Sequence, residues 1–285
     1  MQKSVGNQLL IDQFLIAAIL SAYVAAFWPA WVNLFGVWRH SEDYSHGFVI
    51  VPIALYVLWR KRAALRATPL RPTWLGLPLV LAGLVLYLGA HLAGVLTLGY
   101  LCLVLVPAGV VLFLCGWPIL KKCAFPLFLL LFMIPLPAQL QTAITAPLQL
   151  LVSQATVLLV KFGGIPIIRE GNVLHLPQHS FQVIQACSGL RSIMSLLTLS
   201  LLFAYFTLNS NALRTLLFFA GLPVAIAANV LRVLLMILGL HLLGIDLTEG
   251  KLHELFGIGI FAAGVFLLFC IRSVLTKWDP DTAAK

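Results

Sequence analysis

Three polar residues in an otherwise apolar chain could together form a thiol-based catalytic site: Cys187, Arg232 and His253. A cysteine thiolate is a nucleophile, a histidine ring can take up and return a proton, and a fixed cation can stabilise negative charge on a carbonyl oxygen. Their separation along the chain does not count against such a site, because catalytic groups meet in the fold. These residue types therefore point to acyl transfer.

Cys187 stands, with Ser188 beside it, where a polar segment enters an apolar run. The N-terminus of a helix favours a thiolate, and Arg191, one turn later, adds positive charge. The alternative is a buried structural cysteine, which is the usual state of a free thiol. We expect that state for the cysteines inside apolar runs, namely Cys102, Cys115, Cys123 and Cys270.

Arg232 and His253 lie in and beside the last two apolar runs. An Arg inside a membrane span costs at least ~2.5 kcal/mol, so it is a functional candidate by default. It could instead extend to the membrane surface, but the run continues for about 11 residues, or roughly 16 Å of helix, so a partner inside the bundle is expected. Asn229 lies one turn before it. For His253 the alternative is a solvated or capping residue.

The composition requires a membrane. The chain has 285 residues, of which 61% are hydrophobic and 9% charged, against ~25% charged in soluble domains. We expect an all-α polytopic membrane protein forming one domain over residues 1–285. The net charge of +9 is explained by membrane topology rather than by nucleic acid. The five cysteines form no CxxC pair and no Cys/His metal spacing, so we expect no disulfide framework, metal or cofactor.

About eight transmembrane helices can be placed, because about 20 apolar residues cross the hydrocarbon core. The short second run and the long seventh run, which contains Gly221 and Pro223, are the irregular ones. The expected spans are 12–34, 47–59, 73–93, 96–116, 123–140, 189–207, 214–243 and 255–272.

The basic residues orient these spans. Lysines and arginines gather in alternate loops, for example at 60–71, 121–122 and 272–277. Such clusters mark the cytoplasmic side, so both termini are expected to be cytoplasmic. The stretch 141–187 then faces outward. Its first part, 141–162, could be an interfacial helix, and short apolar runs around 170–172 and 177–180 predict small strands.

At these positions the sequence resembles the exosortase/archaeosortase family of membrane cysteine transpeptidases. The resemblance rests on Ala-Cys-Ser-Gly-Leu-Arg-Ser at 186–192, Asn-Val-Leu-Arg at 229–232 and His253-x-x-x-Gly257. Tyr-Ser-His-Gly at 44–47, which contains His46, and Gly171-Asn172 also resemble the family. The similarity covers about residues 40–275, and the motifs are specific as a set.

The resemblance implies a protease and transpeptidase that acts on exported, membrane-anchored proteins. Their carboxy-terminal sorting signal comprises a Pro-Glu-Pro-like motif, a transmembrane helix and a basic tail. Cys187 would be the nucleophile, Arg232 the oxyanion or thiolate stabiliser and His253 the proton-transfer residue, with Ser188, Arg191, Asn229 and His46 as supporting candidates. The site would face the outside of the cell inner membrane. The acceptor is left open, with a link to exopolysaccharide as one candidate.

Two other functions fit parts of the sequence. A transporter or channel-like protein would use Arg232 as a substrate-charge or coupling site. Against it, the sequence has no inverted repeat and no row of carboxylates inside the spans. A non-catalytic assembly protein is the third interpretation. A thiol reagent added from outside discriminates between them, because only the enzyme depends on Cys187.

Overall fold

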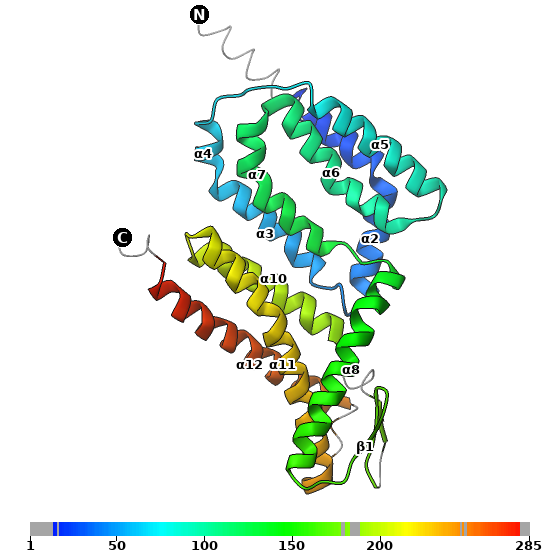
Figure 1. Ribbon diagram of the computed structural model, residues 1–285. Helices are drawn as coiled ribbons and strands as arrows, with labels where there is room; N and C mark the ends of the chain where they lie inside the picture. Colours follow the sequence, from blue (N-terminus) through cyan, green and yellow to red (C-terminus); the bar gives the residue numbers. More distant parts are fainter. Residues whose placement is uncertain are drawn as a thin grey trace, which may run out of the picture. The chain divides into compact units, whose positions relative to one another are not determined.

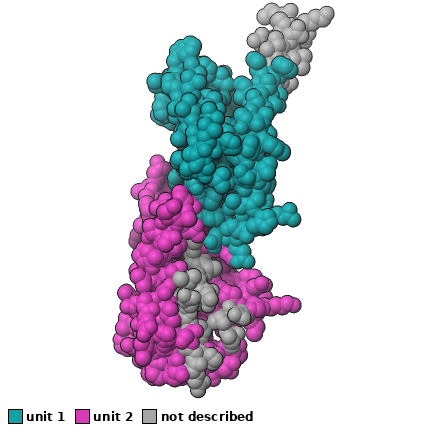
Figure 2. All heavy atoms as spheres, turned by 90° about the vertical axis from the view of Figure 1, so that its right-hand side faces the viewer, with its two compact units in different colours: residues 1–135 teal, residues 136–285 magenta. Residues whose placement is uncertain are grey.

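The chain is mostly α-helical in the computed structural model, which describes residues 14–15, 17–177, 180–182, 189–245, 247 and 250–279 (Figure 1). Contacts between Cα atoms divide it into two compact units, residues 1–135 and 136–285, coloured teal and magenta in Figure 2. The second unit contains Arg232 and His253.

Unit 1 is a set of antiparallel helices. Helices α5 and α6 pack closely because small residues face the partner backbone: a Cβ at Gly76 would lie 2.5 Å from the Cα of Phe113. The elements are a helix over Ala17–Ala26, α2 (Trp28–His40), α3 (Gly47–Arg60), α4 (Arg62–Arg66), α5 (Gly76–Leu92), α6 (Leu96–Cys115), α7 (Trp117–Leu130) and the 3₁₀ turn η1 (Leu131–Met133).

The first apolar run is bent rather than straight. The helix over Ala17–Ala26 and α2 meet at an angle of 67°. Pro29 lies in the first turn of α2, and a proline has no N–H to continue the hydrogen-bond ladder of the preceding helix. The expected span 12–34 is therefore a broken pair of helices that continues to His40.

The described residues of unit 2 form four helices and a small sheet. The strands are antiparallel in the order β1-β2-β3, with Arg169 opposite Leu174 and Leu174 opposite Phe181. The sheet confirms the prediction of short strands in the 141–187 stretch. The elements are α8 (Ala138–Phe162), β1 (Ile168–Glu170), β2 (Val173–His175), β3 (Ser180–Gln182), α10 (Gly189–Thr207), α11 (Asn211–Leu243) and α12 (Gly250–Lys277).

Apolar clusters along α11 hold the described part of unit 2 together. In the first, α8 and the sheet pack on one half of α11, with Val160, Leu174 and Ile237 at its centre. In the second, α10 and α12 pack on the other half, around Leu196 and Leu268. Helix α11 thus packs against each of the other described helices in this unit. Its residues can therefore serve to compare heights along the helix axes, called levels below.

The positions of the expected membrane spans agree with the helices of the structure better than their number does. Helices α3, α6, α10 and α11 begin and end within three residues of the expected spans. An all-α membrane protein fits the structure, but the count of about eight spans is not confirmed. Among the described residues, only α6, α8, α11 and α12 are long and apolar enough to cross a bilayer, or five spans if the bent pair is one.

Helix α8 differs from the expected interfacial helix over 141–162. It has 25 residues, from Ala138 to Phe162, and it meets the length and composition of a membrane span. Its length follows from Pro137, which precedes the helix, and from Gly163, which ends it.

Candidate active site

Arg232 is a buried cation on α11, with 6% of its surface exposed. It lies in a continuous helix that ends only at Gly244, whose φ of +66° suits a glycine. Asn229, three residues earlier on the same helix and 3% exposed, is buried on the same face. The helix therefore carries a polar patch inside an otherwise apolar interface.

His253 on α12 hydrogen bonds to this cation. Its Nε2 lies 2.8 Å from Nη2 of Arg232, and its Nδ1 lies 2.8 Å from the carbonyl oxygen of Leu247. A carbonyl only accepts, so Nδ1 carries the hydrogen and donates it. Nε2 then has the lone pair and accepts from the guanidinium. The contacts thus assign the neutral Nδ1–H tautomer to His253.

The start of α10 lies near the level of this pair. A Cβ at Gly264 of α12 would meet Leu196 of α10 at 3.2 Å and Ala228 of α11 at 3.8 Å, so these three residues share one level. Gly189, where α10 begins, lies seven residues before Leu196, or about 10 Å along a helix. Gly257, which faces Arg232, lies the same distance from Gly264. Cys187 and Ser188, two residues and one residue before α10, lie outside the described residues.

The sheet and α8 pack against the part of α11 that carries Arg232. Val233, next to Arg232 on α11, packs in the same cluster as Leu174 of β2 and Val160 of α8. Ser153 of α8 donates its hydroxyl to the carbonyl oxygens of Leu150 and Gly171, at 2.8 and 3.2 Å. Because Gly171 is in the turn between β1 and β2, this bond attaches the hairpin to α8.

Of the predicted residues, the structure brings Arg232 and His253 into direct contact. Arg191 is half-buried in the first turn of α10. The roles predicted for Cys187, Ser188, Arg191 and Asn229 remain predictions. The carbonyl of Leu247 is a contributor that sequence reasoning missed, since no residue type reports where a backbone carbonyl points.

His46 performs a structural task in unit 1. Its Nε2 donates to the carbonyl oxygen of Phe132 at 3.1 Å, and the indole of nearby Trp38 donates to Met133 at 3.0 Å. These bonds attach the start of α3 and the end of α2 to the 3₁₀ turn η1. Burial lowers the pKa of His46 below the ordinary value of 6.5. A supporting role for His46 in catalysis remains a prediction.

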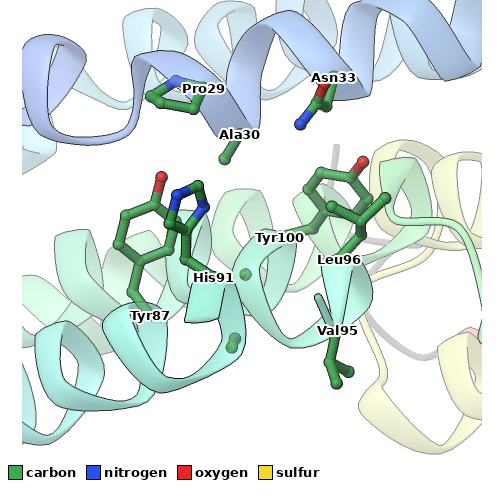
Figure 3. Close-up of a pocket in the computed structure, with 10 residues that line it drawn as sticks. Pro29, Ala30, Asn33, Tyr87, His91, Val95, Leu96 and Tyr100 are labelled. Atoms are coloured by element: carbon green, nitrogen blue, oxygen red, sulfur yellow. The ribbon is translucent and has the colours of Figure 1, made fainter. Parts of the chain in front are cut away.

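A small pocket lies between α2, α5 and α6 of unit 1 (Figure 3). Tyr100 is 1% exposed, and its hydroxyl has no hydrogen-bond partner among the described residues. Asn33 and His91 also line the pocket. The cavity measures about 20 Å³, close to the space that one ordered water needs. We therefore assign it no part in substrate binding.

Comparison with known proteins gives one family. Residues 38–270 match the model of the family described as "Transmembrane exosortase (Exosortase_EpsH)". No curated protein and no solved structure matches the sequence. Within the described residues, no three His, Cys, Asp or Glu side chains are grouped as a metal ion would need.

Proposed function

The chain belongs to the transmembrane exosortase family, and from that premise we propose that it is a membrane-embedded cysteine protease and transpeptidase. Its substrates are exported proteins with a carboxy-terminal sorting signal: a Pro-Glu-Pro-like motif, one transmembrane helix and a basic tail. It cleaves near the motif on the outer face of the cell inner membrane. The upstream part of the substrate is then transferred to an acceptor, for which a link to exopolysaccharide is one candidate.

The observation that carries this proposal is the hydrogen bond of 2.8 Å between Arg232 and His253. It joins two of the three expected catalytic residues, from different helices, near the level where α10 begins. A buried Arg held by a neutral histidine is an unusual pair for packing alone, because burying a charge is costly. The pair is well suited to a reaction in which negative charge develops beside it.

In the proposed reaction, Cys187 attacks the scissile carbonyl carbon. Its thiol proton passes to Nε2 of His253, the ring nitrogen with the lone pair. Once protonated, Nε2 no longer accepts from Arg232, so the guanidinium can donate to the substrate's carbonyl oxygen as that oxygen becomes negative. The carbon–nitrogen bond then breaks, His253 returns the proton to the leaving amine, and the substrate remains as a thioester on Cys187. The acceptor's nucleophile, or water, resolves the thioester.

The dimensions of α11 support a site at the outer boundary of the membrane. Its 33 residues extend over about 50 Å, whereas the hydrocarbon core is ~30 Å thick. Counting about 20 residues from the inner end at Asn211 reaches Arg232. A guanidinium at this boundary lies at the level where a sorting signal emerges from the membrane. We treat residues 1–285 as one functional domain, since the family match extends across both units.

Co-expression with a tagged sorting-signal protein tests the proposal. The unchanged enzyme should shorten the substrate, and Cys187→Ala should leave it intact while both variants reach the membrane in equal amounts. Cys270→Ala is the matched control, because Cys270 is a half-buried free thiol in α12. Equal processing by the unchanged enzyme and Cys187→Ala would exclude the proposed chemistry.

A further inference from the structure

Gly257 faces the guanidinium of Arg232 from the neighbouring helix. A Cβ placed on Gly257 would lie 3.2 Å from Nη2 of Arg232 and 3.5 Å from Cζ. Contacts of 3.0–3.4 Å are tighter than nine in ten real Cβ contacts, so the guanidinium would have to move. The missing side chain at this position therefore leaves space that the cation uses.

The same guanidinium nitrogen makes the hydrogen bond to His253. Nη2 is the atom nearest to the Cβ position and also the atom 2.8 Å from Nε2 of His253. His253 and Gly257 are four residues apart on α12, so they lie one turn apart on one face of that helix. A shift of Nη2 by a few tenths of an ångström would act directly on this hydrogen bond.

His253 cannot follow such a shift freely. Its other ring nitrogen donates to the carbonyl oxygen of Leu247 at 2.8 Å, in the segment between α11 and α12. The ring is thus fixed at both nitrogens, and the guanidinium is fixed between the ring and the backbone of α12. Three elements, namely α11, α12 and the segment between them, meet in this arrangement.

We propose that Gly257 is a positioning residue for Arg232. By lacking a side chain, it lets the guanidinium lie against α12 in the orientation in which His253 accepts its hydrogen. A planar fork of donors is useful only when its plane is set, and a misplacement of about 1 Å can cost ~10²-fold in rate. The inference rests on the proposed function for its catalytic consequence, but the geometry itself can be tested without activity.

The experiment compares Gly257→Ala with Gly259→Ala. Both glycines lie in α12, and a Cβ at Gly259 meets nothing within 4 Å, so the second variant controls for the change in helix propensity. Gly257→Ala should lower kcat for sorting-signal processing by ~10–100-fold with little change in KM, and Gly259→Ala should stay within about twofold of the unchanged enzyme. Gly259→Ala should keep the thermal unfolding midpoint or raise it, because alanine favours a helix, and in Gly257→Ala the loss of the hydrogen bond should offset that gain.

Nitrogen NMR of the histidine rings supplies the readout that does not need activity. The protein has seven histidines, so the signal of His253 is assigned by comparison with His253→Asn, in whose spectrum it is absent. The unchanged protein should show a neutral Nδ1–H ring whose Nε2 accepts a hydrogen bond, and Gly257→Ala should lose the signature of that bond while Gly259→Ala keeps it.

The two readouts separate the two hypotheses. If the unchanged protein processes no substrate but Gly257→Ala alone alters the Nε2 signal, the proposed function fails and the positioning role stands. If Gly257→Ala leaves the Nε2 signal unchanged, or if both glycine variants alter it equally, the positioning role is wrong.

Discussion

The guanidinium of Arg232 shows why a single residue type matters at this site. Arg232 cannot act as a base because it stays protonated, so its contribution must be electrostatic and geometric. One of its nitrogens is occupied by His253 in this structure. Its plane therefore determines where the remaining donors point, and a point charge could not reproduce that arrangement.

Arg232→Lys should lower processing by ~10²–10³-fold, the cost of removing one oxyanion donor. A lysine ammonium keeps the charge but has neither the planar fork nor the reach to His253 and substrate together. Initial rates with a tagged substrate measure the effect, with Arg62→Lys on the exposed helix α4 as control. A rate for Arg232→Lys within threefold of the unchanged enzyme would argue for charge alone.

His46 should make the stability of the protein depend on pH. Burial lowers the pKa of this histidine from 6.5, so the unfolded chain binds a proton that the folded chain resists. The stabilisation is present above about pH 6.5 and is lost as the pH falls through the folded pKa. His46→Gln keeps a donor for Phe132 but does not titrate, so its unfolding midpoint should fall less between pH 7.5 and 5.5. Parallel pH curves for the two proteins would show that His46 is not the cause.

The turn between α6 and α7 shows how an element is fixed by one residue. Gly116 has φ +83° and ψ −178°, a region that is essentially restricted to glycine. A Cβ there would overlap the carbonyl oxygen of Arg71, which precedes α5. The turn therefore both reverses the chain and packs against the segment that leads into the α5–α6 hairpin.

Gly116→Ala should destabilise the protein by more than ~1–3 kcal/mol, since backbone strain and steric overlap add. Gly89→Ala in α5 is the control, because a Cβ there meets nothing within 4 Å; it should be neutral or stabilising by up to ~1 kcal/mol. Thermal unfolding in detergent compares the two. Equal midpoints for the two variants would mean that this turn is not the constraint described here.

The sequence predicts the ends of a helix correctly where an apolar run stops at polar or helix-breaking residues. Helix α10 begins and ends where the run 189–207 does. The expected span 123–140 is wrong at its start. Lys121 and Lys122 indicate a loop in the sequence, whereas helix α7 begins before them, at Trp117. Lys122 is accommodated in the helix by hydrogen bonds from Nζ to Ala64 and Thr68. The sequence contains no signal for such a long-range contact.

The same limit applies to the site. Residue types and a family resemblance selected Arg232 and His253, and the structure brings them together. The hydrogen bond to the Leu247 carbonyl and the space left by Gly257 depend on how two helices pack, which residue types do not report. The count of about eight spans is not confirmed, because the described helices α3 and α5 are apolar but shorter than a straight span requires.

Topology is the prediction that concerns the whole molecule. Both termini should be cytoplasmic and the stretch 141–187 outside, because Lys and Arg cluster in alternate loops. A single cysteine introduced as Gln178→Cys in a background without the other cysteines should react with an impermeant reagent added from outside. A cysteine at Lys277 should react only after the membrane is opened. Labelling of position 178 solely from the cytoplasmic side would place the site on the wrong side of the membrane for exported substrates.

A second whole-molecule prediction is that one thiol suffices. Cys102 and Cys123 are buried and Cys115 and Cys270 half-buried in helices, so replacing all four should affect packing more than chemistry. The quadruple variant, with Cys187 as its only cysteine, should retain processing within about an order of magnitude. Loss of processing by a variant that is folded and membrane-inserted would point to a second reactive cysteine.

The most direct measurement is the mass of the enzyme during turnover. The quadruple variant is mixed with a tagged sorting-signal substrate, quenched in acid, digested and analysed for an adduct. If Cys187 is the nucleophile, the upstream part of the substrate should be attached to it as a hydroxylamine-sensitive thioester, and this adduct should build up when the acceptor is withheld. Processing of the substrate without an adduct on Cys187, or with an adduct on any other residue, would contradict the assignment of Cys187 as the nucleophile.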